Sequence, residues 1–171
     1  MSASEVDQVE AARLPALTRP AGCWWAWVGL HGGAGVTTLA RAVPGGADFG
    51  RLPGEEGWPA LPVVAVCRSH AGGLEAAQRW AAWAAEHGEV PVLGLVVTAD
   101  APGRLPRQLE SMVRLISGGY PSLWRLPWVK AWRLGQPPTP ANTPPAYRHL
   151  LKDLIVRADV PLNHVRNSGG H

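Results

Sequence analysis

Residues 29–38 read Gly-Leu-His-Gly-Gly-Ala-Gly-Val-Thr-Thr and join an apolar run, 23–28, to a short segment of helical character, 36–43. The apolar run predicts a strand that is buried on both faces of a parallel sheet. Glycines allow positive φ angles and let backbone N–H groups converge on an anion, and a helix start adds free donors with a partial positive charge. Strand, glycine-rich turn and helix are the context that a phosphate-binding loop requires.

The ordinary phosphate-loop pattern, G-x-x-x-x-G-K-[ST], is broken at Leu30 and Val36, which replace its first glycine and its lysine. The loop instead resembles the deviant Walker A motif of the MinD/ParA family of P-loop ATPases, K-G-G-x-G-K-[ST]-[ST]. His31 and Val36 stand in place of the two lysines, whereas the three glycines and both threonines are present. The candidate phosphate-binding residues are His31, Gly32, Gly33, Ala34, Gly35, Val36, Thr37 and Thr38.

The resemblance implies what the two missing lysines would do. In that family the second lysine reaches the β- and γ-phosphates, and the first acts across a nucleotide-sandwich dimer. A charge-assisted contact is worth about 1.5–3 kcal/mol, so Val36 should weaken triphosphate binding at least tenfold. Thr37 matches the family residue that ligates Mg²⁺, so ATP or ADP with Mg²⁺ is the implied cofactor. The competing interpretation is a glycine turn that only packs helix against sheet.

A second departure from the family lies in residues 44–61. The family places a strand, a helix and a further strand here, and the last of these carries its Walker B aspartate in a D-x-P-P-G-like run. A crossover needs about a dozen residues or more, so at most one short strand fits, near Asp48. With this carboxylate and both lysines missing, we assign no catalytic residue.

The rest of the chain alternates apolar runs with helical periodicity. The sequence therefore predicts an α/β fold, a small three-layer domain whose parallel sheet has four or five strands, as in P-loop NTPases. The expected strands after the loop are 61–67, 90–98 and 122–127, and the expected helices are 74–87 and 105–117. The expected units are a flexible leader at 1–21, the α/β domain at 22–134, a proline-rich linker at 135–146, a helix at 147–158 and a disordered tail at 159–171.

Polar residues follow a second expected strand. Arg68, Ser69 and His70 come after the run 61–67, as His31 comes after the first strand. Ligands of open α/β sheets bind at the carboxyl ends of strands, so these residues form a candidate accessory anion site. The histidines have no metal-ligand spacing.

The composition of the chain limits the classes of protein to which it can belong. The chain has 171 residues, a net charge of +3 and two cysteines, which suits one compact domain in a reducing compartment. We expect a cytoplasmic protein without a membrane anchor, because no signal peptide and no apolar run of about 18 residues is present. We also expect a monomer, because the lysine that supports the sandwich dimer is absent.

Three functions remain open. The first is a non-hydrolysing relative of the family that acts as a regulatory or scaffolding partner of another protein and binds nucleotide or phosphate weakly. The second is a weak ATPase assisted by a partner. The third is a protein that binds DNA non-specifically through stacking and charge. Its candidate residues are Arg104, Arg107, Arg114, Arg125, Lys130 and Arg133, with Trp124, Trp128 and Trp132, whose spacing of four predicts one helical face.

Overall fold

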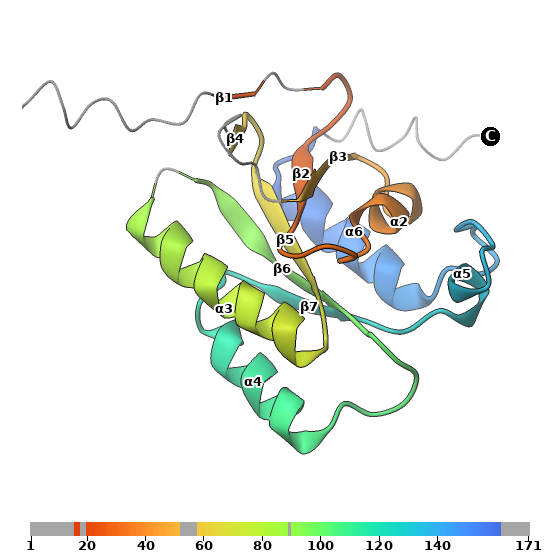
Figure 1. Ribbon diagram of the computed structural model, residues 1–171. Helices are drawn as coiled ribbons and strands as arrows, with labels where there is room; N and C mark the ends of the chain where they lie inside the picture. The colour runs from red at the N-terminus through yellow and green to blue at the C-terminus, as the bar shows by residue number, and fades with distance from the viewer. Residues whose placement is uncertain (1–15, 18–19, 52–57, 89, 162–171) are drawn as a thin grey trace, which may run out of the picture.

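The computed structural model describes residues 16–17, 20–51, 58–88 and 90–161, and shows a five-stranded parallel sheet between two layers of helices (Figure 1). This confirms the expected α/β class and three-layer architecture. The strands of the sheet are β2 (Trp25–Gly29), β3 (Gly46–Arg51), β5 (Val63–Arg68), β6 (Val92–Thr98) and β7 (Leu123–Leu126). The helices are α2 (Val36–Ala42), α3 (Ala71–Glu86), α4 (Arg107–Ser117), α5 (Lys130–Arg133) and α6 (Pro145–Arg157). Two further strands, β1 (Ala16–Leu17) and β4 (Trp58–Pro59), pair with each other in parallel.

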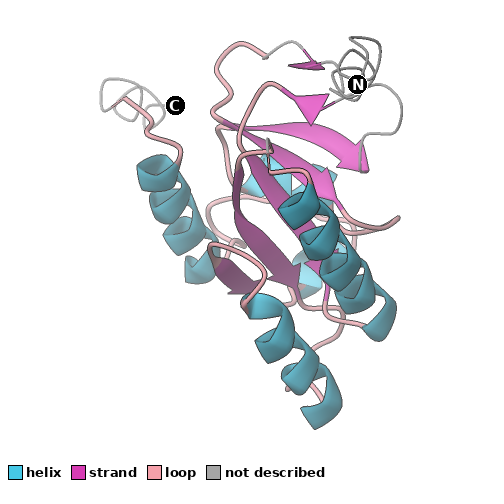
Figure 2. Ribbon diagram, turned by 90° about the vertical axis from the view of Figure 1, so that its left-hand side faces the viewer, coloured by secondary structure: helices cyan, strands magenta, loops and turns pink. Residues whose placement is uncertain are grey.

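The central strands β2 and β5 are apolar up to the Arg68 that ends β5, because helices cover both faces of the sheet (Figure 2). Side chains alternate between the faces along each strand. One core contains Val28 and Ala65 with residues of α3 and α4, and the other contains Trp27 and Val66 with residues of α2 and α6. The loops that leave the strands are therefore held between two packed layers.

The strand order β3-β2-β5-β6-β7 reverses the direction of winding between β2 and β5. From β2 the chain passes through α2 to β3 on one side, and from β5 it passes through α3 to β6 on the other side. Loops that diverge in this way leave a crevice at the carboxyl ends of the two strands, which is where open α/β sheets bind ligands. The glycine-rich loop and the turn after β5 both lie at this position.

The segment between α2 and β5 contains the short strand expected near Asp48, but the expectation of at most one strand there is wrong, because the two-residue strand β4 follows and pairs with β1. The expected strand, β3, is six residues long and pairs in parallel with β2. Gly46 is required there because a Cβ atom would overlap the indole nitrogens of Trp25 and Trp27. The Asp48 carboxylate is exposed and accepts a hydrogen bond from the Gly50 N–H at 2.8 Å, so it serves the local turn.

The proline-rich segment 135–146 is folded rather than extended. The Asn142 side chain accepts hydrogen bonds from Trp132 Nε1 at 2.9 Å and from the Thr139 N–H at 2.8 Å, and it donates to the Pro137 carbonyl at 2.9 Å. The following helix, α6, begins at Pro145 and buries three side chains in the core, Tyr147, Leu150 and Leu154. The helix thus packs on the same sheet as the rest of the domain.

The expected leader at 1–21 and tail at 159–171 lie largely outside the described residues. In the described part of the chain, no helix combines the length and apolar character needed to cross a bilayer.

Candidate functional site

The glycine-rich loop leaves the start of α2 open. Gly33 and Gly35 have φ angles of 75° and 92°, and Gly35 is the N-cap residue of α2 without a side-chain cap. Within the described residues, no acceptor receives a hydrogen bond from the backbone N–H groups of 33–38. The first N–H groups of a helix have no intrahelical partner, so these donors are free for water or a ligand.

His31 fastens the loop to β5. Its Nε2 atom accepts a hydrogen bond from the Arg68 backbone N–H at 3.0 Å, and its Nδ1 atom lies 2.8 Å from the Gly32 carbonyl oxygen, to which it donates. An imidazole that accepts at one nitrogen and donates at the other is the neutral form. The residue at the first lysine position of the resembling motif therefore braces the loop as a neutral group.

A cation from β5 lies beside the loop. Arg68 donates through Nε to the Gly33 carbonyl at 2.8 Å and through Nη1 to the Ala99 carbonyl at 3.5 Å. Its Nη2 atom is 3.6 Å from the place where a Gly35 Cβ would stand. In the described part of the chain, no carboxylate forms an ion pair with Arg68. The guanidinium charge is therefore available next to the left-handed glycine of the loop.

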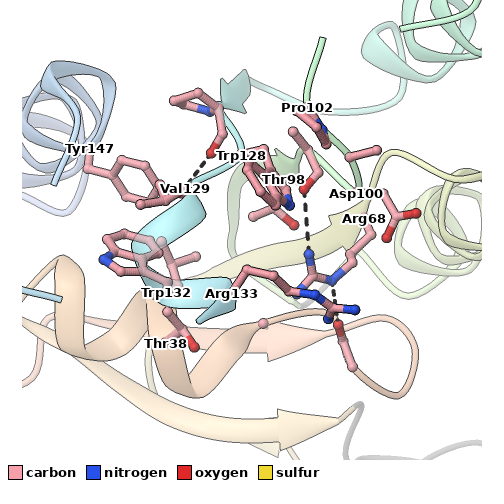
Figure 3. A pocket seen from close by; sticks show the side chains of 16 residues that line it. Thr38, Arg68, Thr98, Asp100, Pro102, Trp128, Val129, Trp132, Arg133 and Tyr147 are labelled. Carbon is pink, nitrogen blue, oxygen red and sulfur yellow. Dashed lines mark hydrogen bonds between the residues drawn. The ribbon is translucent and has the colours of Figure 1, made fainter. Parts of the chain in front are cut away.

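These groups form one end of a cavity of about 680 Å³ (Figure 3). The far end is aromatic, where Trp132 packs edge-to-face on Tyr147 with ring centroids 4.9 Å apart. The Tyr147 hydroxyl donates to the Pro127 carbonyl at 3.2 Å, which fixes this wall to the end of β7. Arg133 of α5 also lines the cavity. The cavity thus combines free cations with an apolar wall, as small-molecule sites commonly do.

Only part of the predicted site lines this cavity. Gly33, Gly35, Thr38 and the accessory residue Arg68 do so. The remaining predicted residues stand outside the lining: Ala34 and Val36 are buried, Gly32 and Thr37 are exposed, and His31 is half-buried against β5.

The other two accessory residues serve the local backbone. Ser69 Oγ accepts a hydrogen bond from the Asp100 N–H at 3.0 Å. His70 is the N-cap of α3, and its Nδ1 atom accepts from the Gly73 N–H at 3.0 Å. The predicted crevice therefore exists, but Arg68 alone of the three points its charge into it.

Sequence reasoning missed the far wall of the cavity. Thr98 and Asp100 could have been found, because Thr98 ends β6 beside β5 and Asp100 follows it, and the carboxyl ends of parallel strands meet at one edge. The wall itself has no local signal, because it forms only when α5 and α6 pack together. The missed lining residues of this second group include Trp128, Trp132, Arg133 and Tyr147.

Burial controls the titration of two groups near the site. Burial raises the pKa of Cys67, which lies in β5 next to Arg68, to about 12. It also raises the pKa of Tyr147 to about 12, although the nearby Arg68 charge acts in the opposite direction. Both groups are therefore neutral at physiological pH. Within the described residues, no cluster of three or more His, Cys, Asp or Glu side chains is placed to hold a metal ion.

The basic and aromatic residues of the third hypothesis lie on different elements. Trp124 is in β7 and Trp132 is in α5, so the expectation that the tryptophans share one helical face is wrong. Trp124 donates to Asp153 at 3.1 Å. Arg125 forms two hydrogen bonds of 2.8 Å to Glu110, which hold the pKa of that carboxyl below its usual range. The charge of Arg125 is thus partly neutralised.

Comparison with known proteins identifies the family. Residues 22–151 match the model of a family of unknown function (DUF6668). The chain belongs to this family. The matched region runs from just before β2 into α6, and it contains the loop, Arg68 and every described residue that lines the cavity.

No curated protein matches the chain. Among solved structures, the chain is similar to a crystal structure of an SsGBP mutation variant, with a TM-score of 0.46 and 15% sequence identity. The similarity covers 89% of this chain and 58% of that one, so the chain spans little more than half of the other protein's length.

Proposed function

We propose that this protein is a non-hydrolysing relative of the MinD/ParA ATPases that binds a nucleotide or phosphate weakly and acts as a regulatory or scaffolding partner of another protein. One observation carries the proposal. The uncapped start of α2 and the guanidinium of Arg68 face the same cavity at the switch point of the sheet. Open N–H groups and an unpaired cation are both suited to an anion.

The same cavity favours binding over hydrolysis. Phosphoryl transfer depends on cations held where charge develops, commonly a lysine and a metal ion. Among the described residues that line the cavity there is no lysine, and the one carboxylate is Asp100, which is exposed. Thr37, the candidate magnesium ligand, is also exposed and lies outside the lining. We therefore assign the ligand a regulatory role. We also propose that the protein is monomeric and cytoplasmic.

Calorimetry with ATP and ADP, combined with a turnover assay, tests this function. We expect weak binding of both nucleotides and no measurable release of phosphate. Gly35→Ala should lower the affinity, because an alanine at a φ of 92° is strained and the loop must change shape. Gly22→Ala is the control, because Gly22 also has a positive φ, 73°, but lies away from the cavity.

Turnover by the purified protein that disappears in Thr37→Ala would instead support a weak ATPase. Absence of binding to either nucleotide would overturn the proposed ligand.

A further inference from the structure

Two arginines line the cavity, and neither forms an ion pair with Asp100, the one carboxylate among the described lining residues. Arg68 comes from the end of β5 and Arg133 from α5, and Figure 3 shows both side chains directed into the same end of the cavity. Within the described residues, neither guanidinium forms an ion pair, and the Arg133 side chain makes no hydrogen bond. Two like charges in one cavity repel each other, and a bound anion relieves the repulsion.

We infer that this cavity binds a phosphoryl group between Arg68 and Arg133 without a divalent metal ion. The inference rests on the proposed function and specifies how its ligand is held. Arg68 keeps its Nε atom on the Gly33 carbonyl and its Nη1 atom 3.5 Å from the Ala99 carbonyl, and its Nη2 atom makes no hydrogen bond within the described residues. Guanidinium groups present planar pairs of donors that match the oxygens of a phosphoryl group.

The absence of a metal requirement follows from charge. Two guanidinium groups already balance the charge of a phosphoryl dianion, and both repel a divalent cation. The oxygen ligands that Mg²⁺ prefers are few in the described lining, where Asp100 is the one carboxylate and is exposed, and Thr38 and Thr98 carry hydroxyls. A phosphoryl group carrying Mg²⁺ should therefore bind less tightly than the free one.

The ligand class is a phosphoryl compound, either attached to a nucleoside or free. Three probes separate the sources, namely ADP, inorganic pyrophosphate and adenosine, each titrated by calorimetry in EDTA and again in Mg²⁺. We expect ADP and pyrophosphate to bind in EDTA, Mg²⁺ to weaken both, and adenosine to bind at least tenfold more weakly than ADP.

Arg68→Gln and Arg133→Gln should each weaken binding of ADP at least tenfold, because each removes a charge-assisted contact. Arg133→Gln is the cleaner variant, since Arg68 also braces the loop. Arg107→Gln is the matched control, because it removes the same charge from an exposed position on α4 outside the cavity.

The outcomes are distinct from those of the proposed function. Binding of ADP that requires Mg²⁺, or that is unchanged in either arginine variant, overturns the two-arginine site and leaves the proposed function standing. Adenosine that binds as tightly as ADP also overturns it. Absence of binding of every probe in both buffers overturns the inference and the proposed function together.

Discussion

Two strand–loop–helix units stand side by side in the sheet, β2–α2 and β5–α3, and their helices begin differently. Each strand is buried and each is followed by a histidine within two residues. In the second unit His70 caps α3 through the Gly73 N–H at 3.0 Å. In the first unit His31 accepts a hydrogen bond from the Arg68 N–H of β5, and α2 begins without a side-chain cap.

The difference indicates which unit is structural. A helix start whose N–H groups are satisfied by its own chain has no donors to offer, whereas an open start binds water or ligand. The cavity lies against the open start and includes Gly33 and Gly35 but neither His70 nor Gly73. The β5–α3 unit is therefore structural, and the β2–α2 unit presents its glycine-rich loop to the cavity.

The largest expected effect of a single change falls on the capped unit. In Gly73→Ala the new Cβ would overlap the Arg68 carbonyl oxygen and stand 3.0 Å from His31 Nε2. A shift of the backbone to relieve this overlap is costly. We therefore expect a loss of about 3 kcal/mol in the free energy of unfolding, or roughly 6–12 °C in Tm. Thermal unfolding followed by circular dichroism measures it.

The matched change in the open loop is Gly32→Ala. A Cβ there meets nothing within 4 Å, and Gly32 does not have a positive φ. We expect its stability to change by less than about 0.5 kcal/mol. Equal destabilisation by the two variants would remove the distinction between a packed unit and an open one.

A smaller effect is expected from the cap itself. His70→Ala should cost about 1 kcal/mol in the free energy of unfolding, because the Gly73 N–H loses its acceptor. His70→Asn should recover most of this loss, since asparagine is a favoured N-cap. Affinity for ADP should stay the same in both variants, because His70 is outside the cavity lining.

Thermal unfolding and calorimetry of the same preparations check this prediction. A His70→Ala variant that folds stably but loses ADP binding would show that the cap of α3 serves the ligand as well.

The sequence predicts both strand–loop–helix units, but it does not predict which helix start is capped and which is open. Buried strands and amphipathic helices have a local periodicity of apolar residues. The parallel sheet and most helix positions can therefore be predicted from this periodicity. The glycine loop was found by its own spacing. The roles of the two histidines depend on the neighbouring strand that each one reaches, and nothing local distinguishes them.

The far wall of the cavity shows the same limit. Trp132 and Tyr147 meet because Asn142 folds the proline-rich segment back beneath α5. Proline content alone predicted an extended linker there, because the long-range contact that bends it has no sequence signature. Arg68 could be proposed as an anion ligand of this crevice from its place after a strand, whereas the sequence indicates Arg133 only as a candidate contact to DNA.

The smallest expected effect compares the two faces of the sheet through the only two tyrosines of the chain. Burial raises the pKa of Tyr147, on the cavity side, to about 12, and it raises the pKa of Tyr120, on the α3 side, further still. The ordinary value is about 10, so the folded protein holds these protons more tightly than the unfolded chain. Their contribution to stability is therefore complete below about pH 10 and falls as pH rises through 10–12.

Absorbance of the phenolate during an alkaline titration measures both groups. The first step should vanish in Tyr147→Phe and remain in Tyr120→Phe. Because the Arg68 charge lowers the pKa of Tyr147, an anion bound to Arg68 should raise that pKa further. ADP should thus shift the first step upward and leave the second in place. A phenolate that forms near pH 10 in the folded protein would contradict the burial of these rings, and an ADP shift shared by both tyrosines would contradict a ligand confined to the open unit.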